Sequence, residues 1–416
     1  MSIKRRSFLR SAGALAATAI AGPAFAQTVI DDILRAPRRG SWNDQFDAAV
    51  SQGGRVASHL PIFSPETVSF VEQAIGQYRD IVAQGGWPAV PANKKLKLGV
   101  IDPDVEPLRR RLIVSGDLSP QAGLSQSFDT YVDAALKRFQ TRHGLPADGV
   151  TGRYTFAAMN VSAPVRLGQL ETNLVRLRTM SGFLGDRYVM VNIPAAAIEA
   201  VENGQVVLRH TAIVGKIDRQ TPILNSKINE IIINPYWNAP ESIVRKDIIP
   251  LMRKNPNYLT ENNIRILGPN GEVDPLTIDW STEEAAKLRF RQDPGKINAM
   301  ASVKINFPNT HAVYMHDTPQ QSLFNNLMRF DSSGCVRVQN VRDLVTWLLR
   351  DTDGWTRQRF EQTIKSGEST PVALANPVPV YFTYISAWST GDGVVQFRDD
   401  IYGRDGVDEL QITSSL

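Results

Sequence analysis

The chain of 416 residues contains one cysteine, Cys335. A thiolate is a strong nucleophile, but a thiol needs a neighbouring base or positive charge to reach that form near neutral pH. One cysteine cannot form a disulfide within its own chain, so it is a buried spectator, half of an intermolecular bridge or a reactive thiol. Composition alone favours the spectator, and the local sequence has to decide.

The sequence around Cys335 favours a reactive group at a turn. Cys335 directly follows Ser332-Ser333-Gly334. Gly334 allows a substrate to approach the backbone closely, and nearby backbone N–H groups could polarise a carbonyl as an oxyanion hole requires. Ser332 either orients the turn or is simply solvated. Arg337, two residues after the cysteine, either binds a substrate carboxylate or braces the turn.

A base for the thiol has to come from one of five histidines: His59, His143, His210, His311 and His316. His316 ends the alternating segment 311–316, and Tyr314 shares its face because strand side chains alternate. One interpretation is a Cys335–His316 pair that generates thiolate. The alternative is a histidine hydrogen-bonded in a core and a cysteine that acts as a small buried hydrophobic residue. Local evidence leaves both interpretations open.

Separated motifs resemble the L,D-transpeptidase family. The string His316-Asp317-Thr318-Pro319, followed by 332–338 (SSGCVRV), looks like its catalytic signature. Supporting strings are INPYW at 233–237 and RQDPG at 291–295. The chain is most similar to the large periplasmic type, which has a lid insertion and a peptidoglycan-binding module. Many members carry a histidine where Ser333 stands, but this type also has serine there.

The resemblance implies that Cys335 is the nucleophile and His316 the general acid and base. The supporting residues it implies are Gly334, Ser333, Ser332, Arg337 and Tyr314. In the family the partner of the catalytic histidine is often a backbone carbonyl, so the third member of the triad stays open. Asp317 is expected in a turn or a cap.

The resemblance also implies a reaction. Cys335 would attack a tetrapeptide stem of peptidoglycan, release the terminal D-Ala and form a thioester, which the amine of an acceptor stem would resolve as a 3→3 cross-link. With water as acceptor the protein would be an L,D-carboxypeptidase or endopeptidase, and without a reactive thiol it would be a wall-binding scaffold. Donor and acceptor stems are the expected partners, other cell-wall synthesis enzymes are further candidates, and carbapenem-type inhibitors are expected to acylate Cys335.

No cofactor is expected, because the sequence has no phosphate loop, no dinucleotide fingerprint and no His and carboxylate set at metal-ligand spacing. The implied process is cell-wall biogenesis and the maintenance of cell shape.

Strand patterns dominate the chain after residue 187. Period-two segments rich in β-branched residues predict strands at 188–193, 205–214, 228–233, 303–307 and 312–316, with further strand signals after residue 380. Asn203-Gly204 predicts a hairpin turn between the first two. Residues 240–295 interrupt this pattern with two segments of helical appearance, 242–255 and 281–291, and an insertion of this size is expected to form a lid. Asn340 is expected to cap a helix that follows Cys335.

Helical patterns dominate the first part. Ser64 is expected to cap a helix that ends at Ala83, and residues 105–114 predict another helix. Asp129 is expected to cap a helix that ends near Gly144, and a further helix is predicted from Thr155. The string from residue 135 to 155 resembles a peptidoglycan-binding helical module, with an ordinary helical hairpin as the alternative.

The predicted fold class is multidomain α+β. It combines a mostly-β catalytic domain that has a helical lid insertion, a small all-α peptidoglycan-binding module and a mixed N-terminal scaffold region. The expected boundaries are 1–26 signal peptide, 27–118 scaffold, 119–164 binding module, 165–186 helical linker, 187–370 catalytic domain with its lid at about 240–295, and 371–416 a C-terminal strand extension that packs on the catalytic domain.

The first 26 residues predict export. A basic start is followed by a short apolar run and a small-residue cleavage site at Ala24-Phe25-Ala26. The run RRSFLR at 5–10 resembles a twin-arginine signal, with a general secretion signal as the alternative. The signal holds four of the 46 basic residues and none of the 42 acidic ones, so the remainder is balanced. A balanced chain gives no case for nucleic-acid binding. We expect a periplasmic protein of a Gram-negative envelope.

Overall fold

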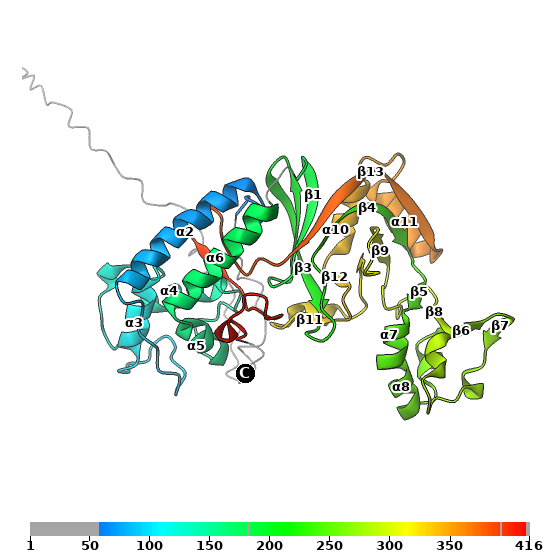
Figure 1. Cartoon of the computed structure of the whole chain (residues 1–416), viewed down its shortest axis with the longest axis horizontal. Helices are drawn as coiled ribbons and strands as arrows, with labels where there is room; N and C mark the ends of the chain where they lie inside the picture. Colours follow the sequence, from blue (N-terminus) through cyan, green and yellow to red (C-terminus); the bar gives the residue numbers. More distant parts are fainter. Residues whose placement is uncertain (1–57, 181–183, 392, 413–416) are drawn as a thin grey trace, which may run out of the picture.

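The structure is a computed structural model that describes residues 58–180, 184–391 and 393–412. The fold is multidomain α+β, with a helical lobe at one end, a curled β-sheet in the middle and a small α/β lobe at the other end (Figure 1). The predicted signal peptide and the beginning of the predicted scaffold region lie outside the described residues. Within the described part, no helix has both the length and the apolar character needed to cross a bilayer.

The helical lobe confirms the helices expected from periodicity. Its elements are α2 (Pro65–Ala83), α3 (Val105–Val114), η2 (Pro120–Ala122), α4 (Thr130–Arg142), α5 (Arg153–Asn160) and α6 (Ala163–Met180). The side chains of Ser64 and Asp129 accept hydrogen bonds from the first turns of α2 and α4, as predicted. Helices α3, α4 and α5 share one hydrophobic core, so α3 packs with the two helices of the predicted binding module.

Strands from the described residues form a nine-stranded sheet in the order β11-β3-β12-β10-β9-β4-β13-β1-β2, and β2 also pairs with β3. This second pairing means that the sheet curls round on itself. Its strands are β1 (Arg187–Asn192), β2 (Ala197–Glu202), β3 (Gln205–Gly215), β4 (Leu224–Ile233), β9 (Val303–Asn306), β10 (Met315–His316), β11 (Phe330–Ser332), β12 (Val336–Val338) and β13 (Thr370–Thr383). Most of the β-branched and other apolar side chains on one face form the largest core with α10 (Val341–Leu349) and α11 (Arg357–Ser366).

Three local predictions were wrong. The Asn203-Gly204 turn joins β2 to β3, whereas the prediction placed it between β1 and β3. The strand β2 was not predicted, because its alanine-rich sequence gives no clear strand signal. The strand expected at 312–316 shrinks to β10, because Ala312 lies in the left-handed region with φ +53°. The helix predicted after Asn340 is present as α10, and Asn340 occupies its N-cap position, but its φ is +51° and its side chain makes no capping hydrogen bond.

The insertion between β4 and β9, here called the lid (residues 234–300), has a fold of its own. It contains α7 (Glu241–Ile243), a π-helical turn (Val244–Ile248), α8 (Ile249–Lys254), α9 (Tyr258–Glu261), η4 (Pro275–Thr277) and η5 (Glu284–Lys287). A four-stranded sheet joins them, with β5 (Trp237–Ala239), β6 (Ile264–Gly268), β7 (Gly271–Val273) and β8 (Arg289–Gln292). The predicted helix at 281–291 is therefore only one short 3₁₀ turn followed by β8. The lid is mixed α/β with a separate hydrophobic core.

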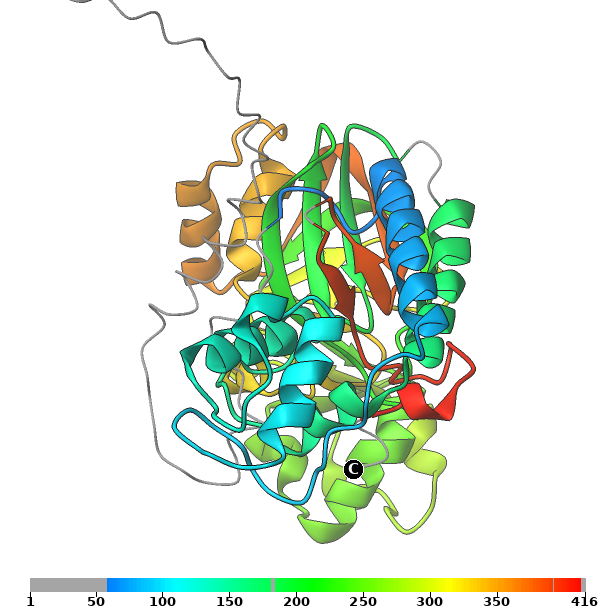
Figure 2. The same cartoon turned by 90° about the vertical axis from the view of Figure 1, so that its left-hand side faces the viewer.

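The C-terminal part first enters the sheet and then leaves it. β13 lies between β4 and β1 as an interior strand. The chain then continues through β14 (Ala387–Ser389), β15 (Val395–Phe397) and η7 (Asp408–Leu410). β14 contacts both α2 and α6, which run side by side over the sheet (Figure 2). Residues after 370 therefore contribute a sheet strand and also join the sheet to the helical lobe.

Candidate active site

Strand pairing brings the sequence-predicted residues to one face of the sheet. β10 and β12 are parallel neighbours in which His316 lies opposite Arg337, and Val336 N–H donates to the Tyr314 carbonyl at 3.1 Å. Met315 and Val336 are fully buried in the main core. Because side chains alternate along a strand, the other face carries Tyr314, His316, Cys335 and Arg337. The fold thus gathers residues that the sequence separates.

A lysine that the sequence analysis did not single out belongs to this face. Lys304 on β9 pairs with His316 across an antiparallel ladder. Its Nζ lies 4.4 Å from the centre of the Tyr314 ring, and the ring centroids of Tyr314 and His316 are 5.5 Å apart. Burial lowers the pKa of Lys304, while the nearby thiol of Cys335 works in the opposite direction. The face therefore combines a thiol, an imidazole, a phenol and two cations.

Hydrogen bonds between its own residues stabilise the turn that precedes the nucleophile. Gly334 N–H donates to Ser332 Oγ at 3.1 Å, and Ser332 Oγ–H donates to the Cys335 carbonyl at 2.5 Å. Ser332 thus orients the turn. Gly334 has φ +112°, a conformation that side chains rarely adopt, so a glycine is needed here.

The hydrogen bonds within this turn determine which backbone N–H groups can still donate to an oxyanion. The N–H of Gly334 is occupied by Ser332. In the described part of the chain, no carbonyl accepts a hydrogen bond from Cys335 N–H. Of the two N–H groups expected for an oxyanion hole, the one on Cys335 is therefore available.

The thiol and the imidazole are both neutral at rest. Burial raises the pKa of Cys335, and contacts with Tyr314, Lys304 and Arg337 only partly oppose this effect. Burial also lowers the pKa of His316 to about 3, and the positive charges of Arg337 and Lys304 add to that effect. A neutral thiol and a neutral imidazole on the same face of the sheet can serve as proton donor and proton acceptor when a substrate arrives.

The backbone sets the orientation of His316. Its Nδ1 lies 2.5 Å from the carbonyl oxygen of Asp317, so Nδ1 carries the proton and Nε2 is the free acceptor. The Asp317 carboxylate binds elsewhere: it accepts from Ser302 Oγ at 2.6 Å and from Thr318 N–H at 2.8 Å. Asp317 therefore stabilises the turn after β10, and a carbonyl takes the position of the third group.

Arg337 lies on β12, directly after the nucleophile turn. Its guanidinium donates to Gln320 Oε1 at 3.1 Å, and burial lowers its pKa. Both interpretations from the sequence, a substrate carboxylate partner or a brace, remain compatible with this position.

The loop after β3, residues 215–221, supports the nucleophile turn from behind. Thr221 Oγ1 donates to the Gly334 carbonyl at 2.9 Å and accepts from Gly215 N–H at 2.9 Å. A Cβ on Gly215 would lie 2.1 Å from the Arg219 carbonyl, so only glycine fits. In the sequence, the one signal for this loop is a glycine at the end of a strand, so the loop was not predicted as part of the site.

An ion pair joins the lid to the same turn. Arg219 binds the Asp247 carboxylate through two hydrogen bonds of 2.5 and 3.0 Å, and it also donates to Ser333 Oγ at 3.0 Å. Asp247 lies in the π-helical turn of the lid, and such turns occur frequently at functional sites. We call these three residues the lid latch. Ser333, implied as a supporting residue, therefore faces the lid.

The base of the lid also reaches the site. Trp237 packs against the lid core. Burial and the Cys335 thiol raise the pKa of Tyr314, and a hydrogen bond with Trp237 partly opposes this rise. Arg291 stacks over the Tyr236 ring at 4.8 Å. These residues come from the two supporting strings, INPYW and RQDPG.

Within the described residues, no group of three or more His, Cys, Asp or Glu side chains is placed to hold a metal ion.

Comparison with known proteins agrees with this geometry. Residues 186–374 match the family described as "L,D-transpeptidase catalytic domain", and residues 102–159 match the one described as "Putative peptidoglycan binding domain". Residues 186–374 are thus similar to an L,D-transpeptidase catalytic domain, and residues 102–159 are similar to a peptidoglycan-binding domain. The second match begins before the expected module boundary at 119 and includes α3.

A Haemophilus influenzae protein named "Putative L,D-transpeptidase" is 38% identical over 239 residues, which are 57% of this chain and 48% of that protein. The chain thus spans about half of that relative's length.

Among solved structures, an L,D-transpeptidase from Mycobacterium smegmatis is 13% identical, with a TM-score of 0.24, over 48% of this chain and 58% of the other. The L,D-transpeptidase of Xylanimonas cellulosilytica (residues 123–326) is 16% identical, with a TM-score of 0.23, over 70% of this chain and 99% of the other.

Proposed function

We propose that this protein is a peptidoglycan L,D-transpeptidase that forms 3→3 cross-links through a thioester on Cys335. The observation that carries the proposal is the shared face of Cys335, His316 and Tyr314 within a domain that matches the L,D-transpeptidase catalytic family.

In the first half-reaction, the Cys335 sulfur attacks the carbonyl at the L-centre of the diamino acid residue in a tetrapeptide stem. His316 Nε2 takes the thiol proton, and the Nδ1–H bond to the Asp317 carbonyl stabilises the imidazolium that forms. The carbonyl oxygen becomes an oxyanion and accepts from Cys335 N–H. When the C–N bond breaks, His316 returns the proton to the amine of the departing D-Ala.

In the second half-reaction, the side-chain amine of an acceptor stem attacks the thioester carbonyl. His316 accepts a proton from this amine, the C–S bond breaks, and the sulfur leaves as thiol when the proton is returned to it. Water would give a shortened stem instead of a cross-link. The lid, attached next to this face by Trp237 and Arg219, is suited to excluding water from the acyl-enzyme.

The domain of the peptidoglycan-binding type supports a location at the wall, outside the cytoplasm. It would raise the local concentration of stems around the catalytic domain, because both domains are parts of one chain. Export through the twin-arginine pathway to a Gram-negative periplasm is part of the same proposal and rests on residues 1–26.

A product assay tests the proposal. Purified protein is incubated with tetrapeptide-stem fragments, and the products are followed by mass spectrometry. We expect cross-linked dimers and free D-Ala with the wild type, and neither with Cys335→Ala. Tripeptide stems without dimers would identify a hydrolase instead, and unchanged products from Cys335→Ala would overturn the assignment of the nucleophile.

Two histidines of one segment provide a matched control. His316 lies in the site, and His311 is exposed at the start of the same segment. We expect His316→Gln to lower turnover by about a hundredfold or more, the range for losing a general base. His311→Gln should keep wild-type turnover. Equal losses in both variants would contradict a specific role for His316.

A further inference from the structure

A tyrosine from outside the matched catalytic domain reaches the loop behind the nucleophile. Tyr402 lies 28 residues beyond the end of the family match at residue 374. Its hydroxyl donates to the Gly215 carbonyl at 2.6 Å and accepts from Thr221 N–H at 3.2 Å. Both hydrogen bonds fix the ends of the loop at 215–221, and Tyr402 is only 8% exposed.

The loop at 215–221 is in turn hydrogen-bonded to the backbone of the nucleophile turn. Thr221 Oγ1 donates to the Gly334 carbonyl at 2.9 Å. The peptide plane between Gly334 and Cys335 is trans, so its C=O and N–H point in opposite directions. Holding the carbonyl toward Thr221 therefore aims Cys335 N–H away from the loop.

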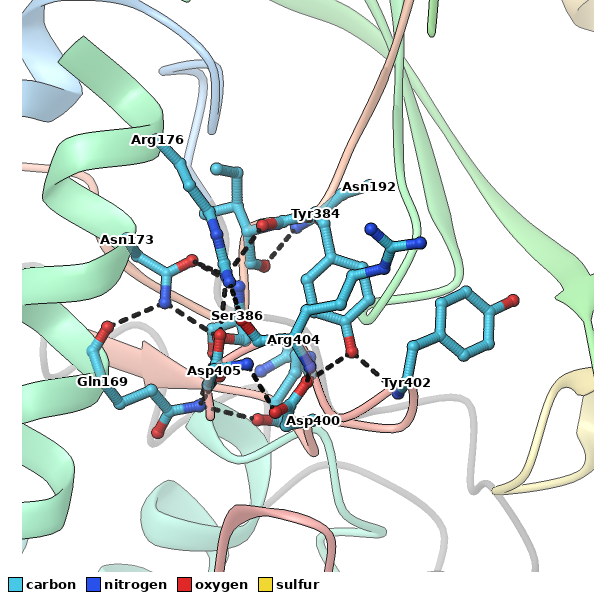
Figure 3. Close-up of polar contacts among 12 residues, drawn as sticks. Gln169, Asn173, Arg176, Asn192, Tyr384, Ser386, Asp400, Tyr402, Arg404 and Asp405 are labelled. Atoms are coloured by element: carbon cyan, nitrogen blue, oxygen red, sulfur yellow. Dashed lines mark hydrogen bonds and ion pairs between the residues drawn. The ribbon is translucent and has the colours of Figure 1, made fainter. Parts of the chain in front are cut away.

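Tyr402 itself is held by a buried polar cluster (Figure 3). Tyr402 N–H donates to the Tyr384 hydroxyl at 2.9 Å, and Tyr384 donates to Asp400 at 2.7 Å. Asp400 also accepts the backbone N–H groups of Arg404 and Asp405 at 2.8 and 2.6 Å. The ring of Tyr402 stacks on the ring of Tyr384, with centroids 5.7 Å apart, and its hydroxyl lies at the end away from the cluster (Figure 3). The cluster therefore fixes the backbone and ring of Tyr402 and leaves the hydroxyl to reach the loop.

The cluster is anchored to the helix that leaves the binding-type domain. Asp405 accepts from Arg176 of α6 at 2.6 Å and from Ser386 at 2.5 Å, and Asn173 of α6 donates to Ser386 at 2.8 Å. A continuous set of hydrogen bonds therefore runs from α6 through Asp400 and Tyr402 to the nucleophile turn.

We propose that Tyr402 is a positioning residue of the active site: by fixing the loop at 215–221, its hydroxyl aims the Cys335 N–H at the oxyanion. This inference rests on the proposed acyl transfer, because an oxyanion forms only when the thiol attacks a carbonyl. The C-terminal segment beyond the matched domain is thereby part of the catalytic machinery.

The test compares two reactions of Cys335 in the variant Tyr402→Phe. Acylation by a carbapenem passes through an oxyanion, whereas alkylation by iodoacetamide requires only the thiolate. Both are followed as mass increases of the intact protein. We expect Tyr402→Phe to slow acylation at saturating carbapenem by about tenfold or more, since small displacements of an oxyanion donor are costly. Alkylation should stay within about twofold, because the thiol keeps its surroundings.

Tyr188→Phe is the matched control, because the buried Tyr188 hydroxyl also donates to a backbone carbonyl, that of Phe63, at 2.7 Å. We expect it to lower the thermal midpoint as Tyr402→Phe does and to leave the acylation rate unchanged. Thr221→Ser and Thr221→Val provide a second pair, in which only the valine should slow acylation.

The outcomes are distinct. If wild-type protein is alkylated but never acylated, the proposed function fails and the role of Tyr402 fails with it. If wild type is acylated and Tyr402→Phe and Thr221→Val match its rate, the positioning role alone is wrong. Equal slowing of acylation and alkylation in Tyr402→Phe would also overturn it.

Discussion

Behind the nucleophile turn, Thr221 and Tyr402 are buried and hydrogen-bonded to backbone groups. On the lid side, Arg219 and Asp247 are only half-buried and hold the turn through one exposed side chain, Ser333. The buried side fixes peptide groups, and the lid side joins two lobes that have separate hydrophobic cores. The difference indicates that the first side sets the geometry of the nucleophile turn, whereas the second is a more exposed contact between the lid and that turn.

The largest effect is expected on the buried side from Gly215→Ala. Its Cβ would lie 2.1 Å from the Arg219 carbonyl and 2.6 Å from Thr221 N, so the loop has to move. Overpacking of this kind costs about 1–3 kcal/mol of unfolding free energy. Carbapenem acylation should slow as well, because Thr221 moves away from Gly334. Chemical denaturation and intact-protein mass measure the two effects.

Gly168→Ala is the control for that substitution. Gly168 lies in α6, and an added Cβ meets nothing within 4 Å. Alanine should stabilise the helix by about 0.5–1 kcal/mol and leave acylation unchanged. A Gly215→Ala variant that behaves like Gly168→Ala would show that the loop is not tightly packed.

The stability of the fold should depend on pH through His316 on the catalytic face, and not through the lid latch. The pKa of His316 is lowered to about 3 by burial and by the charges of Arg337 and Lys304, whereas a histidine in the unfolded chain titrates near its ordinary pKa of 6.5. The unfolded chain therefore binds the proton first, and stability falls as pH drops from 6.5 toward 3. His316→Gln should show a shallower loss in denaturant unfolding measured across this range.

A second buried histidine contributes to the same acid response. Burial between Phe139 and Phe397 holds the pKa of His143 well below the ordinary value for histidine, so part of the loss of stability in acid should survive in His316→Gln. The hydrogen bond with Asp247 raises the pKa of Arg219, so the guanidinium stays charged through this range. An identical pH slope in His316→Gln and the wild type would contradict a neutral, buried His316.

The smallest change in stability is expected from Asp247→Asn in the lid latch. A partly exposed ion pair contributes about 0–1 kcal/mol and is screened by salt. The variant should therefore have almost the same unfolding free energy as the wild type. At low salt, where the ion pair is least screened, limited proteolysis should cut the lid of the variant faster than the lid of the wild type. Arg245→Gln is the control, because Arg245 pairs with Glu241 and Glu283 inside the lid. Equal proteolysis of both variants would show that the latch does not hold the lid.

The sequence predicted those parts of the site whose signals are local. Periodicity and capping residues placed α2 and α4, and strand alternation placed Tyr314 beside His316. The short motifs around Cys335 indicated the turn that Ser332 stabilises.

The residues that the sequence could not reveal act across long separations. Tyr402 contacts Gly215 across 187 positions, and Lys304 joins the site only through the register of β9 and β10. No periodicity or motif encodes such pairings, because they depend on how the sheet curls. The strand β2 and the sheet of the lid were missed for another reason, since alanine and charged residues give weak strand signals.

The most direct test of the central claim is the site of the covalent intermediate. Wild-type protein is mixed briefly with a tetrapeptide-stem donor, quenched in acid, digested and sequenced by mass spectrometry. We expect the donor, less its terminal D-Ala, as a thioester on the peptide that contains Cys335, and we expect no adduct in Cys335→Ala. An adduct on another residue, or dimers formed by the variant without Cys335, would contradict the account.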